Sequence, residues 1–181
     1  MGVPELNDLP KYTYEDYCIW EGRWELIDGV AYAMSPMPMI EHQSISSKIA
    51  RYLEEALEEC EKCRALLPVD WKIDESTIVQ PDNLVICYPA QGAYITKAPC
   101  VIFEILSKST AAKDIGLKFR LYEREGVKYY IIVDPIEKLA KVYELHDGKY
   151  IKKLDATTET TTFSLSECSF DFDFSKIFTT H

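Results

Sequence analysis

The sequence lacks several features that would assign it to a class at once. Its 181 residues contain no apolar run of membrane-spanning length, no internal repeat and no low-complexity tract, so we expect one globular domain over residues 1–181 and no membrane partner. Positive charge is scarce, because 20 Lys and Arg face 30 Asp and Glu and give a formal net charge of -10. This balance argues against a protein that coats nucleic acid non-specifically, although it is compatible with a local basic surface.

The six cysteines lack the arrangement of a complete metal site. Cys60 and Cys63 form one C-x-x-C motif inside a run that we predict to be helical, without the second cysteine pair or the histidine pair that a zinc site requires. The pattern therefore favours two incidental thiols on a helix. Because several cysteines fall in apolar strands and no secretory leader is evident, we expect reduced thiols and a cytoplasmic protein.

Hydrophobic periodicity and turn signals predict a helix, a hairpin and a long helix in the first third of the chain. The first helix begins after a Thr13 cap and is closed by Gly22. Asp28-Gly29 between two alternating apolar stretches predicts a hairpin. Residues 44–67 repeat apolar side chains at helical spacing and form the long helix.

The rest of the chain alternates strand-like and helical runs. We predict three strands at residues 69–75, 82–88 and 100–106, followed by a helix at 109–126 and a buried strand at 128–135. A second hairpin at 139–155 and a short edge strand with a final turn at 163–178 complete the chain. This order predicts an α/β fold in which a mixed central β-sheet is flanked by helices, with an N-terminal and a C-terminal hairpin.

Two acidic residues stand in aliphatic runs that should be buried. Asp82 follows Pro81 at the start of "DNLVIC", a position that also suits a loop-edge residue, whereas Glu104 lies in the middle of "VIFEIL". A buried carboxylate must be hydrogen-bonded, paired with a cation, protonated or bound to a metal. Two acids on neighbouring strands that project into one notch suit a hard divalent cation such as Mg²⁺ or Mn²⁺.

Two lysines are candidates to work beside these acids. Lys108 follows Glu104 by four residues, and Lys118 lies one turn beyond Asp114 on the predicted helix. A lysine near a metal site can orient a nucleophile or stabilise charge on a phosphoryl oxygen. From spacing alone, a surface ion pair between Lys118 and Asp114 is the favoured interpretation.

Several motifs together resemble one known family. The chain contains, in order, "RWELIDGVAYAMSP", "HQSISSKIARYLE", "VQPDNLVI", "VIFEILSKST", "DIGLKFRLYEREGVKYYIIVDP" and "VYEL". Their order and spacing resemble the Uma2 family, also called DUF820, of restriction-endonuclease-like proteins in the PD-(D/E)xK nuclease superfamily. The resemblance covers roughly residues 12–146, and the run of motifs is far more specific than any single one.

The resemblance implies a metal site. Asp82 and Glu104 match the acids that hold the metal in the superfamily, with the backbone carbonyl of Ile105 as a further ligand. Glu25 and His42 also match characteristic Uma2 positions. Glu25 would be a further acid of the metal shell or an exposed hairpin residue that faces a basic partner, and His42 would bind metal-bound water or phosphate, or else be a capping or packing residue.

The resemblance also implies where the catalytic lysine has moved. Leu106 stands two positions after the acid, where the superfamily usually has its lysine. Uma2-like sequences place a lysine on the next helix, and Lys118 is the matching position. Lys108 competes because it would share the strand face of Glu104 if that strand ran on, but family members often carry proline there.

The function that this resemblance implies is metal-dependent hydrolysis of phosphodiester bonds in DNA. Lys113, Arg120 and Arg124 flank Lys118 on the predicted helix and either approach backbone phosphates or belong to a solvated face. By analogy with restriction enzymes we expect a homodimer. Two alternatives stay open, namely a catalytically inactive nuclease fold that serves as a binding or assembly module, and a hydrolase of another phosphate ester.

Overall fold

Two mixed β-sheets organise the chain in a computed structural model that describes residues 9–34, 39–107 and 111–179. The strands are β1 (Trp24–Ile27), β2 (Val30–Ala33), β3 (Arg64–Leu66), β4 (Asp70–Asp74), β5 (Thr77–Val79), β6 (Asn83–Ile86), β7 (Tyr94–Ile95), β8 (Val101–Ile105), β9 (Tyr129–Asp134), β10 (Leu139–His146), β11 (Lys149–Ala156), β12 (Thr160–Ser164) and β13 (Ser169–Asp173). The helices are α1 (Tyr14–Cys18), α2 (Ile40–Ala56), the π-helix η2 (Lys113–Lys118), α3 (Phe119–Glu125) and the 3₁₀ turn η3 (Phe174–Lys176).

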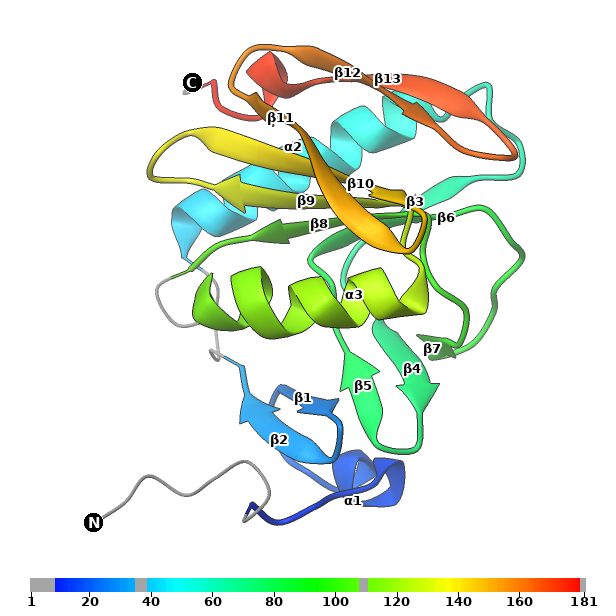
Figure 1. Cartoon of the computed structure of the whole chain (residues 1–181), viewed down its shortest axis with the longest axis vertical. Coiled ribbons are helices and arrows are strands. Elements are labelled where there is room, and N and C mark those ends of the chain that lie inside the picture. The colour runs from blue at the N-terminus through cyan, green and yellow to red at the C-terminus, as the bar shows by residue number, and fades with distance from the viewer. Residues whose placement is uncertain (1–8, 35–38, 108–110, 180–181) are drawn as a thin grey trace.

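The larger sheet has six strands in the order β11–β10–β9–β8–β6–β3, and only β8 and β9 run parallel. The smaller sheet has five strands in the order β2–β1–β5–β4–β7, while β12 and β13 form a separate hairpin. Figure 1 shows α2 and the β12–β13 hairpin on one side of the six-stranded sheet, with α3 on the other side. The smaller sheet and α1 complete the α3 side.

Strand alternation divides the buried side chains into two cores. Phe103 and Ile131 face α2 and belong to the α2-side core, whereas Ile102 and Ile132 face α3 and belong to the α3-side core. Successive residues of a strand point to opposite faces, so both faces of β8 and β9 are buried. Glu104 shares the parity of Ile102 and therefore projects toward α3.

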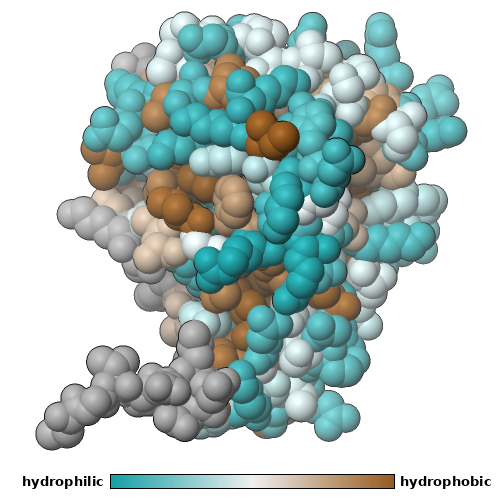
Figure 2. Space-filling view, in the orientation of Figure 1, coloured by the Kyte–Doolittle hydropathy of each residue, from teal (hydrophilic) through white to brown (hydrophobic). Residues whose placement is uncertain are grey.

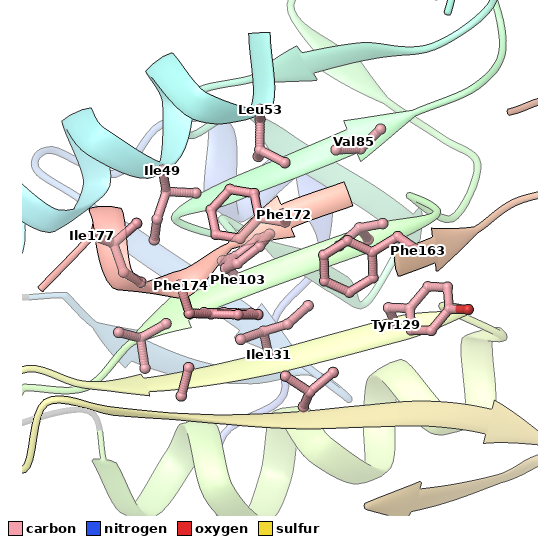
Figure 3. Packing of buried hydrophobic residues seen from close by; sticks show 14 of the residues in the cluster. Ile49, Leu53, Val85, Phe103, Tyr129, Ile131, Phe163, Phe172, Phe174 and Ile177 are labelled. Atoms are coloured by element: carbon pink, nitrogen blue, oxygen red, sulfur yellow. The ribbon is translucent and has the colours of Figure 1, made fainter. Parts of the chain in front are cut away.

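Aromatic rings from the C-terminal hairpin close the α2-side core. The ring of Phe103 in β8 lies 5.3 Å from that of Phe172 and 6.3 Å from that of Phe163, and Phe174 packs 5.0 Å from Phe172 (Figure 3). The expected short edge strand and final turn is therefore a two-stranded hairpin with a 3₁₀ turn. Its phenylalanines are core residues.

Both predicted hairpin turns are confirmed. Asp28 and Gly29 have φ values of 49° and 79°, and Asp147 and Gly148 have φ values of 48° and 76°. Positive φ at both central residues is the mark of a type I′ turn, whose twist matches that of the flanking strands. The Asp-Gly dipeptides thus fix the register of β1–β2 and β10–β11.

The expected long helix is shorter in the structure than predicted. α2 ends at Ala56, and Arg64–Leu66 pair with β6 as an edge strand. The first helix likewise ends at Cys18, before the predicted stop at Gly22. Helical periodicity continued past Ala56 in the sequence, but pairing with β6 is a tertiary contact that overrides local propensity.

The expected reduced thiols and the single central sheet are also corrected. Disulfides join Cys60 to Cys168 and Cys63 to Cys87, while Cys18 and Cys100 are free. The two pairs are 108 and 24 residues apart in the sequence. The pairing of β3 with β6 and the position of the β12–β13 hairpin bring their members together. Likewise, the apolar runs predicted strands without naming their partners, and the structure divides them between two sheets.

The described surface carries few apolar side chains that are not packed. Figure 2 shows them as small groups among hydrophilic residues on the face of Figure 1. Within residues 9–34, 39–107 and 111–179, no helix is long and apolar enough to cross a membrane.

We predict that the C-terminal hairpin stabilises the whole fold. Phe172→Ala should lower the free energy of unfolding by about 3–5 kcal/mol, because the 1% exposed ring leaves a cavity against Phe103. Urea denaturation followed by circular dichroism measures this change. Ile136→Ala is the matched control, because Ile136 is 78% exposed and its loss should change stability by no more than about 0.5 kcal/mol. Equal effects of the two substitutions would contradict the role of the hairpin.

Candidate active site

The ammonium of Lys118 joins the two sheets. Its Nζ lies 2.8 Å from Oε1 of Glu104 in the six-stranded sheet and 2.8 Å from Oε1 of Glu25 in the five-stranded sheet. Lys118 and Glu104 are each 2% exposed, and Glu25 is 0% exposed. The surface-pair interpretation of Lys118 is therefore wrong, although Asp114 does contribute a third carboxylate at 3.6 Å.

Glu25 is held at both carboxylate oxygens. Oε1 accepts hydrogen bonds from the backbone N–H of Gln80 at 2.9 Å and contacts Lys118, while Oε2 pairs with the ammonium of Lys113. The carboxylate comes from β1 and points, like Ile27 two residues on, toward the α3-side core. Glu25 is thus a buried anchor for two lysines, and the interpretation as an exposed hairpin residue is wrong.

The π-helical winding of η2 explains why both lysines reach one carboxylate. Lys113 and Lys118 are the first and last residues of this segment. Hydrogen bonding from i to i+5 places residues five apart on one face, whereas an α-helix aligns residues three or four apart. Single π-turns are found frequently at functional sites. The winding also leaves Asp114 close to Lys118 within the same segment.

Asp82 is fixed at the start of β6 by two donors on one oxygen. Its Oδ2 accepts the backbone N–H of Ile105 at 2.8 Å and lies 3.2 Å from Nε2 of His42, the third residue of α2. Asn83 pairs with Phe103, so the register of β6 and β8 continued by one position sets Asp82 opposite Glu104. Directly opposite residues share a sheet face, so both acids project the same way.

Tyr122 is a member of this cluster that the sequence analysis missed. Its hydroxyl donates to Oε1 of Glu104 at 2.7 Å, on the same oxygen that Lys118 contacts. Its ring stacks on Trp71 with centroids 5.8 Å apart and meets Tyr130 edge-on at 5.1 Å. The available signal was the Lys118-x-x-x-Tyr122 spacing, which puts both side chains on one helical face.

The aromatic pair also supports the π-helix. Tyr130 donates its hydroxyl to the backbone carbonyl of Asp114 at 2.8 Å. Tyr130 and Tyr122 therefore connect η2, Glu104 and the α3-side core through buried rings. Burial raises the pKa of both phenols well above the usual value, so both hydroxyls keep their protons as donors.

The pKa values of Glu25 and Asp82 are lowered, whereas that of Glu104 is raised. Burial alone would raise the pKa values of Glu25 and Asp82. Lys118 and Lys113 nevertheless hold the pKa of Glu25 below its usual value, and the hydrogen bonds from His42 and the Ile105 amide do the same for the pKa of Asp82. Both carboxylates are therefore ionised at neutral pH.

Glu104 and Lys118 form the coupled centre of the cluster. Burial, together with the neighbouring charges of Asp114, Asp82 and Glu25, raises the pKa of Glu104 well above its usual value despite the opposing effect of Lys118. The pKa of Lys118 is also raised well above its usual value, because attraction to Glu104, Glu25 and Asp114 outweighs burial. Lys118 thus keeps its proton and acts as a fixed positive charge, not as a base.

The donor atoms fit a metal of the Mg²⁺ type only in part. In the described part of the chain, no three His, Cys, Asp or Glu side chains form a ready ligand group for a metal. Asp82 and Glu104, however, each receive both donors on a single oxygen, which leaves Oδ1 and Oε2 outside those bonds. The Nδ1 atom of His42 is buried without a hydrogen-bond partner among the described residues. Two carboxylates are enough for Mg²⁺, which retains several waters and binds substrate phosphates.

Of the other cations predicted for the site, the described ones lie outside the Lys118 cluster, except for Lys113. Lys108 lies outside the described residues. Arg120 is exposed, and Arg124 is exposed and pairs with Asp28 and Glu125 at the surface. Lys113 is the one flanking cation that reaches the cluster.

A solved structure shares the fold of this chain. A crystal structure from Anabaena variabilis, described as "a putative nuclease belonging to DUF820", superposes with a TM-score of 0.74 over 92% of this chain and 97% of that chain, at 18% sequence identity. At this identity the likeness concerns the fold. A protein of Synechocystis sp. described as "Uncharacterized protein slr1290" is 30% identical over 148 residues, which make up 77% of each chain.

The family assignment follows from the sequence model. Residues 13–172 match the Uma2 family, which is described as "Putative restriction endonuclease". The chain belongs to this family, and the predicted resemblance is confirmed. The match extends past the motifs noted in the sequence to include the C-terminal hairpin.

We predict that loss of the central ammonium destabilises the protein. Lys118→Met should lower the free energy of unfolding by about 3–5 kcal/mol, because Glu25 and Glu104 lose a buried partner. Adding Glu104→Gln should recover about 0.5–3 kcal/mol of that loss, since one uncompensated carboxylate disappears. Chemical denaturation of the single and double variants measures this coupling.

Arg120→Met supplies the matched control, because Arg120 is an exposed cation on α3, which directly follows η2. It should change stability by no more than about 0.5 kcal/mol. The buried network would be refuted if Lys118→Met and Arg120→Met had the same stability.

Proposed function

We propose that this protein is a metal-dependent endonuclease that hydrolyses phosphodiester bonds in DNA at the Asp82–Glu104–Lys118 cluster. The observation that carries the proposal is the arrangement of the two acids. Each has one oxygen engaged by protein donors, and the two carboxylates project the same way from paired strands. Membership of the Uma2 family supports the same activity.

Mg²⁺ or Mn²⁺ is the cofactor that these donors suit. Asp82 Oδ1 and Glu104 Oε2 would hold it, and the carbonyl of Ile105 is the third candidate ligand. The N–H of Ile105 already points at Asp82, and the N–H and C=O of a strand residue point to the same side. When bound, the cation would polarise a phosphoryl oxygen and neutralise charge on the departing oxygen.

The protein side chains would supply a fixed electrostatic frame. Lys118 stays protonated and lies against Glu104, so its charge is available to stabilise negative charge that develops on a phosphoryl group. Glu25 holds that ammonium in place without taking its proton. His42 orients Asp82 through Nε2 and presents its unpaired Nδ1, which can accept a hydrogen bond from water.

An inactive nuclease fold that serves as a binding or assembly module is the second candidate. It is favoured by the internal pairing of the cluster, in which Lys118 already neutralises part of the acidic charge. The net charge of -10 also disfavours tight binding to a polyanion outside a basic cleft. Cleavage assays separate the two candidates.

We predict that Mn²⁺ or Mg²⁺ allows the purified protein to nick supercoiled plasmid. Asp82→Asn and Glu104→Gln should abolish cleavage, because each replaces a carboxylate oxygen ligand of the cation by an amide while keeping side-chain shape. Lys118→Met should slow cleavage by roughly 10²–10³-fold, since a preorganised charge is lost. Gel assays on supercoiled, linear and single-stranded DNA measure these rates.

Glu137→Gln is the control for the acidic substitutions, because Glu137 is exposed in the turn after β9. It should cleave at the wild-type rate. Absence of cleavage with either metal on all three DNA forms, or equal activity in Asp82→Asn and wild type, would favour the non-catalytic module.

We also propose that two chains associate, by analogy with restriction-type folds, which commonly pair two active sites to cut two strands. Sedimentation velocity should give a mass near twice the 20.9 kDa of one chain. A purely monomeric protein at micromolar concentration, with the nicking activity intact, would instead indicate a single-strand nickase.

A further inference from the structure

Five of the six cysteines gather at one end of the α2-side core, away from the candidate active site. Cys63 is buried in this core, and Cys60, Cys87, Cys100 and Cys168 pack against it. Glu104 lies on the opposite face of the same sheet. The sequence contained one C-x-x-C motif without a second pair, and the fold supplies the two missing cysteines from distant segments.

The C-x-x-C motif lies on a tight turn after α2. α2 has ended at Ala56, and the backbone N–H of Cys63 donates to the carbonyl of Cys60 at 2.9 Å, which closes a tight turn. Such a turn brings residues i and i+3 close together. Cys60 and Cys63 therefore lie next to each other on one short loop.

Each cysteine of this turn meets one partner from another element. Cys63 stands opposite Cys87 where β3 pairs with β6, with Cα atoms 4.0 Å apart. Cys60 meets Cys168 in the turn between β12 and β13, with Cα atoms 5.8 Å apart. Figure 1 shows the end of α2 near this turn. The two disulfides thus join one tight turn to the end of β6 and to the turn between β12 and β13.

We propose that in the reduced protein the thiolates of Cys60, Cys63, Cys87 and Cys168 form a structural zinc site. Four sulphur ligands, including one C-x-x-C pair, are the set that a closed tetrahedral Zn²⁺ site uses. A sulphur atom in a disulfide is not a thiolate and does not bind Zn²⁺ in such a site. The zinc site therefore exists only when both disulfides are reduced. Zn²⁺ would then fasten α2, β3–β6 and the C-terminal hairpin together, as the disulfides do in the oxidised form.

Conversion of the disulfide form to the zinc form requires a dithiol reductant and Zn²⁺. Each disulfide accepts two electrons and two protons from a dithiol reductant, which becomes a disulfide itself. The four thiols then release protons as Zn²⁺ binds. Cys100 is left out of the ligand set, because the other four cysteines already complete a tetrahedral site.

The test uses the full chain, reduced with a dithiol, treated with a chelator and titrated with Zn²⁺. Elemental analysis should find one zinc per chain. Zinc should protect four cysteines from iodoacetamide, so that intact mass shows two alkylations, at Cys18 and Cys100. This measurement needs no variant, so no substitution can disturb the fold. No zinc at one equivalent, or six alkylations in its presence, would overturn the proposal.

Matched variants assign the ligands. Cys168→Ser should lose stoichiometric zinc and the visible tetrathiolate absorption of the Co²⁺ form, whereas Cys100→Ser and Cys18→Ser should keep both. Glu104→Gln should also keep the zinc, which separates this site from the Asp82–Glu104 cluster. Equal zinc binding by Cys168→Ser and Cys100→Ser, or loss of zinc in Glu104→Gln, would refute the assignment.

Discussion

The buried ammonium of Lys118 ties the two sheets to each other. It bridges Glu25 of the five-stranded sheet and Glu104 of the six-stranded sheet, and it is carried by the helical segment between them. Desolvating three charges is expensive, and the attraction between them offsets that cost only when geometry and additional hydrogen bonds are favourable. Here Gln80 and Tyr122 supply those hydrogen bonds, so the network specifies how the two sheets and the helix fit together.

The same constraint prepares the cluster for chemistry. Because Lys118 and Tyr122 share Oε1 of Glu104, and His42 and the Ile105 amide share Oδ2 of Asp82, the two carboxylates have fixed orientations. Fixed ligands and a fixed positive charge are what electrostatic catalysis requires, since little reorganisation accompanies the reaction. Stability and the proposed activity therefore depend on the same few contacts.

Much of this organisation could be predicted from the sequence, and the missing parts have physical reasons. The Asp-Gly turns, the buried β9 strand and the family motifs depend on local patterns, which a single sequence displays. The end of α2, the pairing of Cys63 with Cys87 and the division into two sheets depend on contacts between distant segments, which it does not. The lysine of the cluster was recovered through the resemblance, because its spacing with Asp114 alone suggested a surface pair.

The π-helix was the least predictable feature of the cluster. The residues of "KDIGLK" do not predict hydrogen bonding from i to i+5. Only the structure shows that the π-helix directs both Lys113 and Lys118 to Glu25. Tyr122 was missed for a different reason, since its ring reads as a core residue until its hydroxyl is seen on Glu104. Both cases show buried polar contacts that hydrophobic periodicity does not register.

Anomalous diffraction from crystals soaked in Mn²⁺ would locate the cation relative to Asp82 and Glu104. The expected result is one manganese peak within bonding distance of Asp82 Oδ1 and Glu104 Oε2, with Lys118 still in contact with Glu25 and with Oε1 of Glu104. A peak elsewhere, or none between the two acids at saturating Mn²⁺, would contradict a metal site built on this network.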